Sequence, residues 1–194
     1  SQKLFSNAIS EFESLGANYI TYNPLKKTES KNIVPTENDN YFRNQLLKGY
    51  VHDPGAAMQD GLGGHAGLFS NANDLAKLLQ MYLNLGEYGD EKYFSESTIR
   101  YFTSYQFPPK INRRGIGFDK PSFDDDGPSS NFASKLSYGH SGFTGTLVWN
   151  DPKYDLIYIF LSNRIHPNAE NDLLIKNNVR TEIQDIIYNS ILWK

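Results

Sequence analysis

The chain has 194 residues, of which 39% are hydrophobic and 14% aromatic, and it carries a formal net charge of −3 at pH 7. A chain of this length and composition can bury one substantial core, so we expect a single domain over residues 1–194. The acidic balance gives no electrostatic reason to expect a nucleic-acid partner, and no apolar run approaches the ~20 residues that a membrane-spanning helix needs. The absence of cysteine excludes disulfides and thiolate metal sites.

The first part of the chain begins with a helical pattern. Apolar residues recur at intervals near three and four over residues 3–15, and Gly16 follows as a helix end. Residues 26–40 are polar and contain a proline, which indicates a long surface loop. Residues 41–50 fit a helical turn or a strand equally well. The glycine-dense segment that ends at Gly67 indicates a compact loop, because glycine disfavours a regular helix.

Two helices with N-terminal caps follow. The Ser-Asn pair at 70–71 precedes an amphipathic helix that Gly86 ends. Residues 95–102 begin with a serine cap and predict a second helix. Residues 115–118 are typical of a short strand, and residues 123–130 have turn chemistry and no apolar period, so they predict a loop.

Residues 137–150 carry the clearest strand and turn pattern of the chain. A polar, glycine-rich run is followed by a β-type run, a turn with proline and a second apolar run at 156–161. This pattern predicts an antiparallel hairpin whose first strand begins at His140-Ser141-Gly142. An imidazole, a hydroxyl and a flexible backbone position then lie where a ligand can follow the strand's edge.

The run His-Ser-Gly-Phe-Thr-Gly at 140–145 resembles the third motif of the serine β-lactamase and penicillin-binding-protein superfamily, in its class C-like branch. Residues 61–76 resemble the segment that precedes a surface helix in that branch, and both lie in the family's order. The resemblance implies a β-lactamase/transpeptidase-like fold of the α/β (α+β) class, an antiparallel sheet with flanking helices. The helical spacing over 179–191 predicts a C-terminal helix that packs on this sheet.

Two of the family's three motifs are absent. No Ser-x-x-Lys occurs in the sequence. Residues 82–84 and 129–131 match the letters of the second motif, but the first set lies within an amphipathic helix and the second lies close to His140, so packing and a loop are the preferred interpretations. Because both missing motifs come earlier in the family, we expect the C-terminal portion of a longer serine hydrolase, with the N-terminal, nucleophile-bearing part missing. The alternative is a natural relative that never carried the nucleophile.

The resemblance implies which residues form the site. His140 and Ser141 take the catalytic positions, with the imidazole assisting proton transfer and the hydroxyl binding the same ligand. Gly142, Phe143 and Thr144 take the substrate-binding positions, and backbone N–H groups of the strand help to form an oxyanion hole. The alternative is that His140 and Ser141 merely begin a strand.

Other polar residues do not predict a metal or cofactor site. His52, Asp53 and His65 fit no tight ligand spacing, so hydrogen bonding within a glycine-rich loop is the preferred interpretation. Residues 124–126 are three aspartates that lack the pattern of a calcium loop. We therefore expect no metal and no cofactor.

Three functions stay open. The favoured one is acyl transfer through a serine acyl-enzyme, on a β-lactam, a D-amino-acid peptide or an ester; the others are a non-catalytic binding module for cell-wall fragments and an interaction domain without a site. Arg113 and Arg114 are interpreted as surface charge, whereas Asn163 and Arg164 are left open as residues that face the site. The partner is a small-molecule or peptide substrate, and the resemblance implies a periplasmic or extracytoplasmic location. Apolar surface left by a missing part predicts self-association.

Overall fold

The structure is a computed structural model that describes residues 2–122 and 127–192. The chain divides into two units, which we call unit 1 (Ser1–Leu78 with Ser162–Asp172) and unit 2 (Leu79–Leu161 with Leu173–Lys194). Each unit has its own set of buried residues. The single domain expected from the sequence stays a prediction.

Unit 1 combines one long helix with short antiparallel strand pairs. The elements are α1 (Gln2–Ser14), β1 (Thr21–Tyr22), η1 (Pro24–Lys26), η2 (Ser30–Asn32), β2 (Pro35–Asp39), β3 (Gln45–Lys48), α2 (Pro54–Ala57) and β4 (Leu68–Phe69). Strand β1 pairs with β4, and β2 pairs with β3. The helix predicted over 3–15 is confirmed, and Gly16 follows it with a φ of 75°. Residues 41–50 fitted a helical turn or a strand equally well, and the structure forms a strand there, β3. Helix α2 adds one helical turn at the start of the glycine-dense loop.

The prediction of a loop over 26–40 is wrong for residues 35–39, which form β2 (Pro35–Asp39). No apolar alternation marks this strand, and Thr36 is its only β-branched residue, so its residues do not predict a strand. Hydrogen bonds from distant parts of unit 1 hold it instead. Asn163 Nδ2 donates to the Pro35 carbonyl at 3.0 Å, and the Asn38 N–H donates to the Pro167 carbonyl at 3.0 Å.

Unit 2 contains a three-stranded sheet with helices. The helix α3 (Ala72–Leu83) enters it at Leu79, and the other elements are β5 (Glu87–Tyr88), β6 (Glu91–Lys92), α4 (Glu96–Thr103), β7 (Tyr138–Ser141), β8 (Leu147–Asp151), β9 (Leu156–Phe160), α5 (Leu173–Lys176) and α6 (Val179–Leu192). Both predicted caps are present: Asn71 Oδ1 accepts from the Asp74 N–H at 2.9 Å, and Ser95 Oγ accepts from the Thr98 N–H at 3.1 Å. No helix in the described part of the chain is both long and apolar enough to span a bilayer.

The sheet of unit 2 is an antiparallel meander with the order β7-β8-β9. The hairpin between β8 and β9 confirms the predicted pairing of two apolar runs. Its first strand begins at Leu147, however, and not at His140-Ser141-Gly142 as predicted. His140 and Ser141 instead end the preceding strand, and a turn closed by the Gly142 N–H and the Thr146 carbonyl at 2.8 Å leads into β8.

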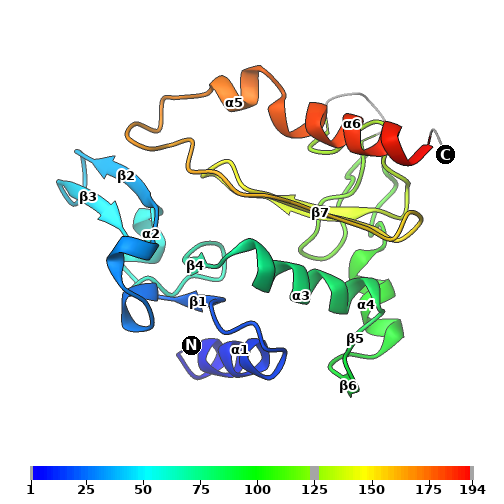
Figure 1. Cartoon of the computed structure of the whole chain (residues 1–194), viewed down its shortest axis with the longest axis horizontal. Coiled ribbons are helices and arrows are strands. Elements are labelled where there is room, and N and C mark those ends of the chain that lie inside the picture. The colour runs from blue at the N-terminus through cyan, green and yellow to red at the C-terminus, as the bar shows by residue number, and fades with distance from the viewer. Residues whose placement is uncertain (1, 123–126, 193–194) are drawn as a thin grey trace. The chain divides into compact units, whose positions relative to one another are not determined.

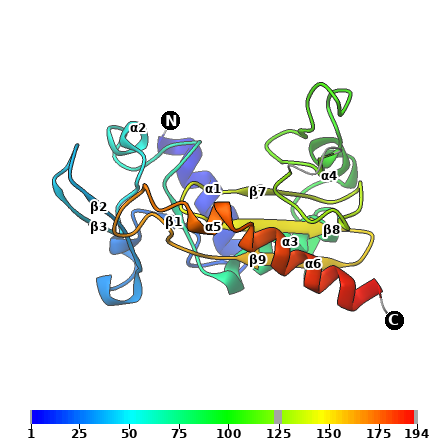
Figure 2. The ribbon, with the colours of Figure 1, turned by 90° about the horizontal axis from the view of Figure 1, so that it is seen from above.

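The core of unit 2 lies between this sheet and α6. Leu147, Trp149 and Tyr158 form a buried cluster on one face of the sheet, and Ile183 and Ile187 of α6 pack against it. Helix α6 lies over that face in both views (Figures 1 and 2). The predicted packing of the C-terminal helix on the sheet is therefore confirmed.

The strand predicted at 115–118 is wrong. These residues form a turn, in which Gly117 has a φ of 76°, between Arg114 and Asp119, which form an isolated antiparallel bridge. Glycine adopts a left-handed backbone conformation more readily than residues with a Cβ, so Gly117 marks a turn and not a strand. Of the loop predicted at 123–130, residues 123–126 lie outside the described residues, and so do the three aspartates at 124–126.

Candidate active site

The end of strand β7 presents backbone groups at an open edge of the sheet. Gly139 donates its N–H to the Asp119 carbonyl at 3.0 Å and accepts from the Asp119 N–H at 2.7 Å. Because backbone groups alternate sides along a strand, the N–H of Ser141 faces this same outer edge, while His140 and Gly142 face β8. On the side of β7 that faces away from β8, the Asp119 bridge is the only backbone pairing among the described residues. An extended ligand can therefore lie along the edge at Ser141.

His140 has an exposed side chain with a defined tautomer. Its Nδ1 lies 2.7 Å from the Ser141 carbonyl oxygen. A carbonyl can only accept, so Nδ1 carries the hydrogen, and in the neutral ring Nε2 is the acceptor. The imidazole is thus held at the strand end with one nitrogen available for proton transfer.

Strand alternation sends the side chains of His140 and Ser141 to opposite faces of the sheet. Ser141 pairs with Leu147 in the register and so shares its face with the core under α6, whereas His140 pairs with Val148 and shares the other face. The two residues are therefore joined through the backbone and not through their side chains. Their common contact with one ligand stays a prediction.

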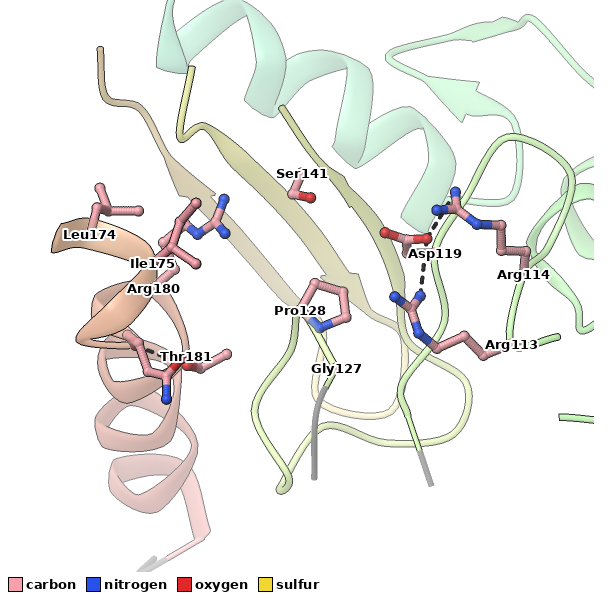
Figure 3. A pocket seen from close by; sticks show the side chains of 11 residues that line it. Arg113, Arg114, Asp119, Gly127, Pro128, Ser141, Leu174, Ile175, Arg180 and Thr181 are labelled. Carbon is pink, nitrogen blue, oxygen red and sulfur yellow. Dashed lines mark hydrogen bonds and ion pairs between the residues drawn. The ribbon is translucent and has the colours of Figure 1, made fainter. Parts of the chain in front are cut away.

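On the α6 face, Ser141 lines an open pocket of about 320 Å³ (Figure 3). Its walls come from the turn after α4, the loop before β7 and the α5–α6 segment, and its other lining residues are Arg113, Arg114, Asp119, Gly127, Pro128, Leu174, Ile175, Asn178, Arg180 and Thr181. Among the described lining residues there are three arginines and one aspartate, which together carry a net charge of +2. We call this the arginine pocket.

The arginines of this pocket are held in place by their partners. Asp119, which is 3% exposed, lies 3.1 Å from Arg113 Nη1 and 3.0 Å from Arg114 Nη1. Arg180, in the first turn of α6, donates from Nη1 to the carbonyls of Gly145 and Thr146 at 3.3 Å each. The bridge of Asp119 to β7 and the start of α6 therefore bring guanidinium groups to the side of Ser141, as Figure 3 shows.

The predicted substrate-binding residues lie in the turn between β7 and β8. A Cβ at Gly142 would lie 2.4 Å from Thr146 Oγ1, so any other residue there requires the Thr146 side chain to move. Phe143 is 62% exposed, and Thr144 is half-buried. These residues are next to Ser141 in the chain, and their contact with a substrate stays a prediction.

The polar residues that sequence analysis set aside have local partners. His52 Nε2 lies 3.3 Å from Glu37 Oε2, and His65 Nε2 lies 2.9 Å from Asp53 Oδ1. The N–H of Ala56, followed by His65, holds the pKa of Asp53 below its usual value. No group of metal-ligating side chains occurs in the part of the chain that the structure describes.

The two motif look-alikes also have packing roles. Tyr82 stacks edge-on against Phe118 with 5.4 Å between ring centroids, and burial raises its pKa. The Ser130 N–H donates to Gln184 Oε1 at 2.7 Å, and its hydroxyl donates to Asp185, so this serine ties its loop to α6.

Sequence reasoning missed the arginine pocket. It interpreted Arg113 and Arg114 as surface charge, and it placed Arg180 on an amphipathic helix without a functional role. The only signal is the acidic residue six positions after Arg113, which fits a local ion pair but does not reveal a pocket. Arg180 lies far along the chain from Ser141, so no local spacing connects them.

The sheet with a helix packed on its core face defines a mixed α/β protein of the β-lactamase/transpeptidase fold. Among solved structures, simvastatin synthase (LovD6 mutant) from Aspergillus terreus is similar at a TM-score of 0.62 and 18% identity, over 93% of this chain and 48% of that chain. This likeness supports the fold alone.

The chain belongs to the Beta-lactamase family, which matches residues 19–181. A putative D-alanyl-D-alanine carboxypeptidase of Escherichia coli K12 is 35% identical over 174 residues, which are 80% of this chain and 38% of that protein. An N-acetylmuramyl-L-alanine amidase of Bacillus subtilis is 36% identical over 172 residues, again 80% of this chain and 38% of that protein. The chain therefore spans well under half the length of these relatives.

Proposed function

We propose that this chain forms the substrate-binding wall of a serine hydrolase of the β-lactamase and peptidase type, whose preferred substrate is a peptide that ends in a free carboxylate. The observation that carries the proposal is the arginine pocket, whose described lining residues carry a net charge of +2, beside Ser141 at the open edge of β7. Family membership and the hydrolase names of the relatives support the reaction class. The relatives' cell-wall names also favour an extracytoplasmic location.

The substrate backbone lies along the outer edge of β7, where the Ser141 N–H donates to a substrate carbonyl. The terminal carboxylate faces the arginine pocket, because guanidinium groups bind carboxylates through charge-assisted hydrogen bonds. The Ser141 hydroxyl lines the same pocket and can donate to that carboxylate. This places the scissile bond at the strand end, next to the turn that carries Phe143.

The nucleophile comes from sequence outside residues 1–194, since Ser-x-x-Lys does not occur within them. Its serine oxygen attacks the scissile carbonyl carbon, the bond to the leaving amine or alcohol breaks, and the leaving group takes up a proton. Water then cleaves the acyl-serine ester. His140 assists proton transfer through Nε2, the acceptor nitrogen of its neutral ring.

The test compares the full-length protein that contains these residues with variants, on three substrates: a D-alanyl-D-alanine peptide, its C-terminal amide and a p-nitrophenyl ester. Arg180→Gln lowers kcat/KM for the free-carboxylate peptide by about 10- to 100-fold, the value of a charged hydrogen bond. It leaves the ester unchanged, because the ester has no carboxylate to bind. Arg100→Gln, which removes an exposed arginine of α4 that is paired with Glu96, changes neither rate.

His140→Ala lowers kcat on all three substrates, because proton transfer does not depend on the carboxylate. A full-length protein that is folded and binds the peptide without hydrolysing any substrate supports the binding-module alternative. Equal losses on the peptide and the ester in Arg180→Gln refute the role given to the arginine pocket.

A further inference from the structure

Asp119 brings a buried carboxylate to the arginine pocket that the proposed reaction does not use. A buried carboxylate is costly unless it is paired, and both ion pairs here end on its Oδ1, at 3.1 Å from Arg113 Nη1 and 3.0 Å from Arg114 Nη1. Among the described residues, Asp119 is the only hydrogen-bond or ion-pair partner of either guanidinium. The two arginine side chains are 30% and 50% exposed, so this carboxylate is what holds them in place.

The backbone of Asp119 decides where its carboxylate lies. Residues directly opposite each other in an antiparallel pair point to the same face of the sheet, so the Asp119 side chain takes the face of Gly139. Gly139 pairs with Trp149 of the core under α6, and Ser141 follows two residues along on that same face. Because Gly139 has no side chain, no side chain of β7 stands between the Asp119 carboxylate and Ser141, which Figure 3 shows on the same side of the sheet.

The same residue also ends the open edge of β7. The Asp119 N–H donates to the Gly139 carbonyl at 2.7 Å, and the Asp119 carbonyl accepts from the Gly139 N–H at 3.0 Å. Two positions along a strand lie about 7 Å apart, and one residue of an extended ligand spans about 3.4 Å. A peptide that pairs with the Ser141 N–H can therefore extend by about one residue toward Gly139 before it meets Asp119.

We propose that Asp119 is a positioning residue that sets where a bound peptide ends, through its backbone bridge to β7 and through Arg113 and Arg114. This role rests on the proposed function, in which the carboxylate of the substrate faces the arginine pocket. Charge-assisted hydrogen bonds depend on geometry, so guanidinium groups that are fixed relative to the strand bind a carboxylate best at one distance from Ser141. The site then selects the position of the carboxylate and not only its charge.

The test measures kcat/KM of the full-length protein that contains these residues, on two peptides whose last residue is glycine or β-alanine. Both carry the same charge and no terminal side chain, and β-alanine places the carboxylate one methylene further along. The glycine peptide is preferred about 10- to 100-fold, the value of one hydrogen bond to a charged group. A peptide with one more glycine is hydrolysed at the same bond about tenfold more slowly or less, because the added residue must displace the two backbone hydrogen bonds of Asp119.

Asp119→Asn keeps the backbone bridge and the shape of the side chain, and it removes the charge that holds the two arginines. It lowers the preference for glycine over β-alanine by about tenfold, because freed guanidinium groups can follow either carboxylate. The ratio of the two peptides isolates this effect, since the added positive charge of the pocket and any loss in the fold act on both peptides alike.

Two further variants separate positioning from a general effect of charge. In a background with Arg113→Gln and Arg114→Gln, Asp119→Asn changes the ratio no further, because Asp119 acts through these side chains. Glu96→Gln, which breaks an exposed ion pair with Arg100 elsewhere in unit 2, leaves the ratio unchanged.

Equal hydrolysis of the glycine and β-alanine peptides by the unchanged protein overturns the role of Asp119, while the proposed function stands if the free carboxylate is still preferred over the amide. No preference over the amide refutes the proposed function, and the role of Asp119 falls with it. A loss on both peptides in Asp119→Asn that keeps their ratio shows that Asp119 is only structural and also overturns the proposal. The first two results come from the unchanged protein, so they decide even if Asp119→Asn does not fold.

Discussion

Lys120 of unit 2 is a buried lysine, and its titration should change the stability of the unit with pH. Its side chain is 2% exposed, and Nζ donates to the Leu136 carbonyl at 3.0 Å. The rings of Tyr105 and Tyr138 lie 5.1 and 5.7 Å from Nζ. Burial lowers the pKa of Lys120 from 10.5 to about 8, and the charge of Asp151 opposes this only in part.

The sign of the pH dependence follows from these values. Below pH 8 both states carry the charge, and the folded state bears the full cost of burying it. Above pH 8 the folded amine loses its proton while the unfolded amine keeps it, so the unfolded state binds more protons and the free energy of unfolding rises with pH. Burial raises the pKa of Tyr138 to about 12, so above its ordinary value of 10.0 the unfolded chain loses this proton first and stability falls again.

Between pH 8 and pH 10 the contribution of Lys120 to the free energy of unfolding should therefore rise by about 2 kcal/mol. It is measured as the difference between the chain and Lys120→Met, because other tyrosines with a raised pKa, such as Tyr82, Tyr105 and Tyr188, lower the stability of both as the pH approaches 10. The measurement is urea unfolding at a series of pH values, followed by tryptophan fluorescence in a Trp193→Phe background, so that the buried Trp149 of unit 2 is the only reporter. Lys120→Met removes the rise, because it has no amine to titrate. A difference in unfolding free energy between the chain and Lys120→Met that stays constant or falls from pH 8 to pH 10 refutes the reasoning.

Substitutions at three further positions test hydrogen bonding, packing and capping, each by urea unfolding. Tyr188→Phe removes a hydroxyl that donates to the buried Asp151 Oδ2 at 2.8 Å and should cost about 1.5–3 kcal/mol, the value of a hydrogen bond to a charged group; Tyr188→Leu, which loses packing as well, should cost more. Gly139→Ala places a Cβ 2.1 Å from the Val148 carbonyl oxygen and should cost about 1–3 kcal/mol or more, since the backbone must separate; no loss would contradict the close approach. Ser95→Ala removes the cap of α4 and should cost about 1 kcal/mol, whereas Ser95→Asp should restore most of it.

The helices could be predicted because their signals are local. Residues 3–15 and 179–191 show apolar spacings close to the helical period, and Ser95 caps the helix that follows it. Strand β2 could not be predicted, because Pro-Thr-Glu-Asn-Asp at residues 35–39 has no β-type pattern and its partners lie far along the chain.

The candidate site could be predicted only along the strand. A run of polar and glycine residues identified His140 and Ser141, but it did not show that they end one strand before the hairpin starts at Leu147. It also did not show what lies beside the strand. Arg180 reaches the pocket because α6 packs on the sheet, and such lateral neighbours leave no trace in the spacing of residues.

The close contact at Gly139 fixes the register of strand β7 against β8. With a Cβ position only 2.1 Å from the Val148 oxygen, position 139 admits no side chain. A slip of β7 by one residue would drive Tyr138 or His140 into that slot and would also exchange the faces to which His140 and Ser141 point. Residues inserted into the turn after Ser141 must therefore bulge outward instead of sliding the strand. The length of that turn can therefore be varied in libraries of variants while His140 and Ser141 keep their positions on opposite faces of the sheet.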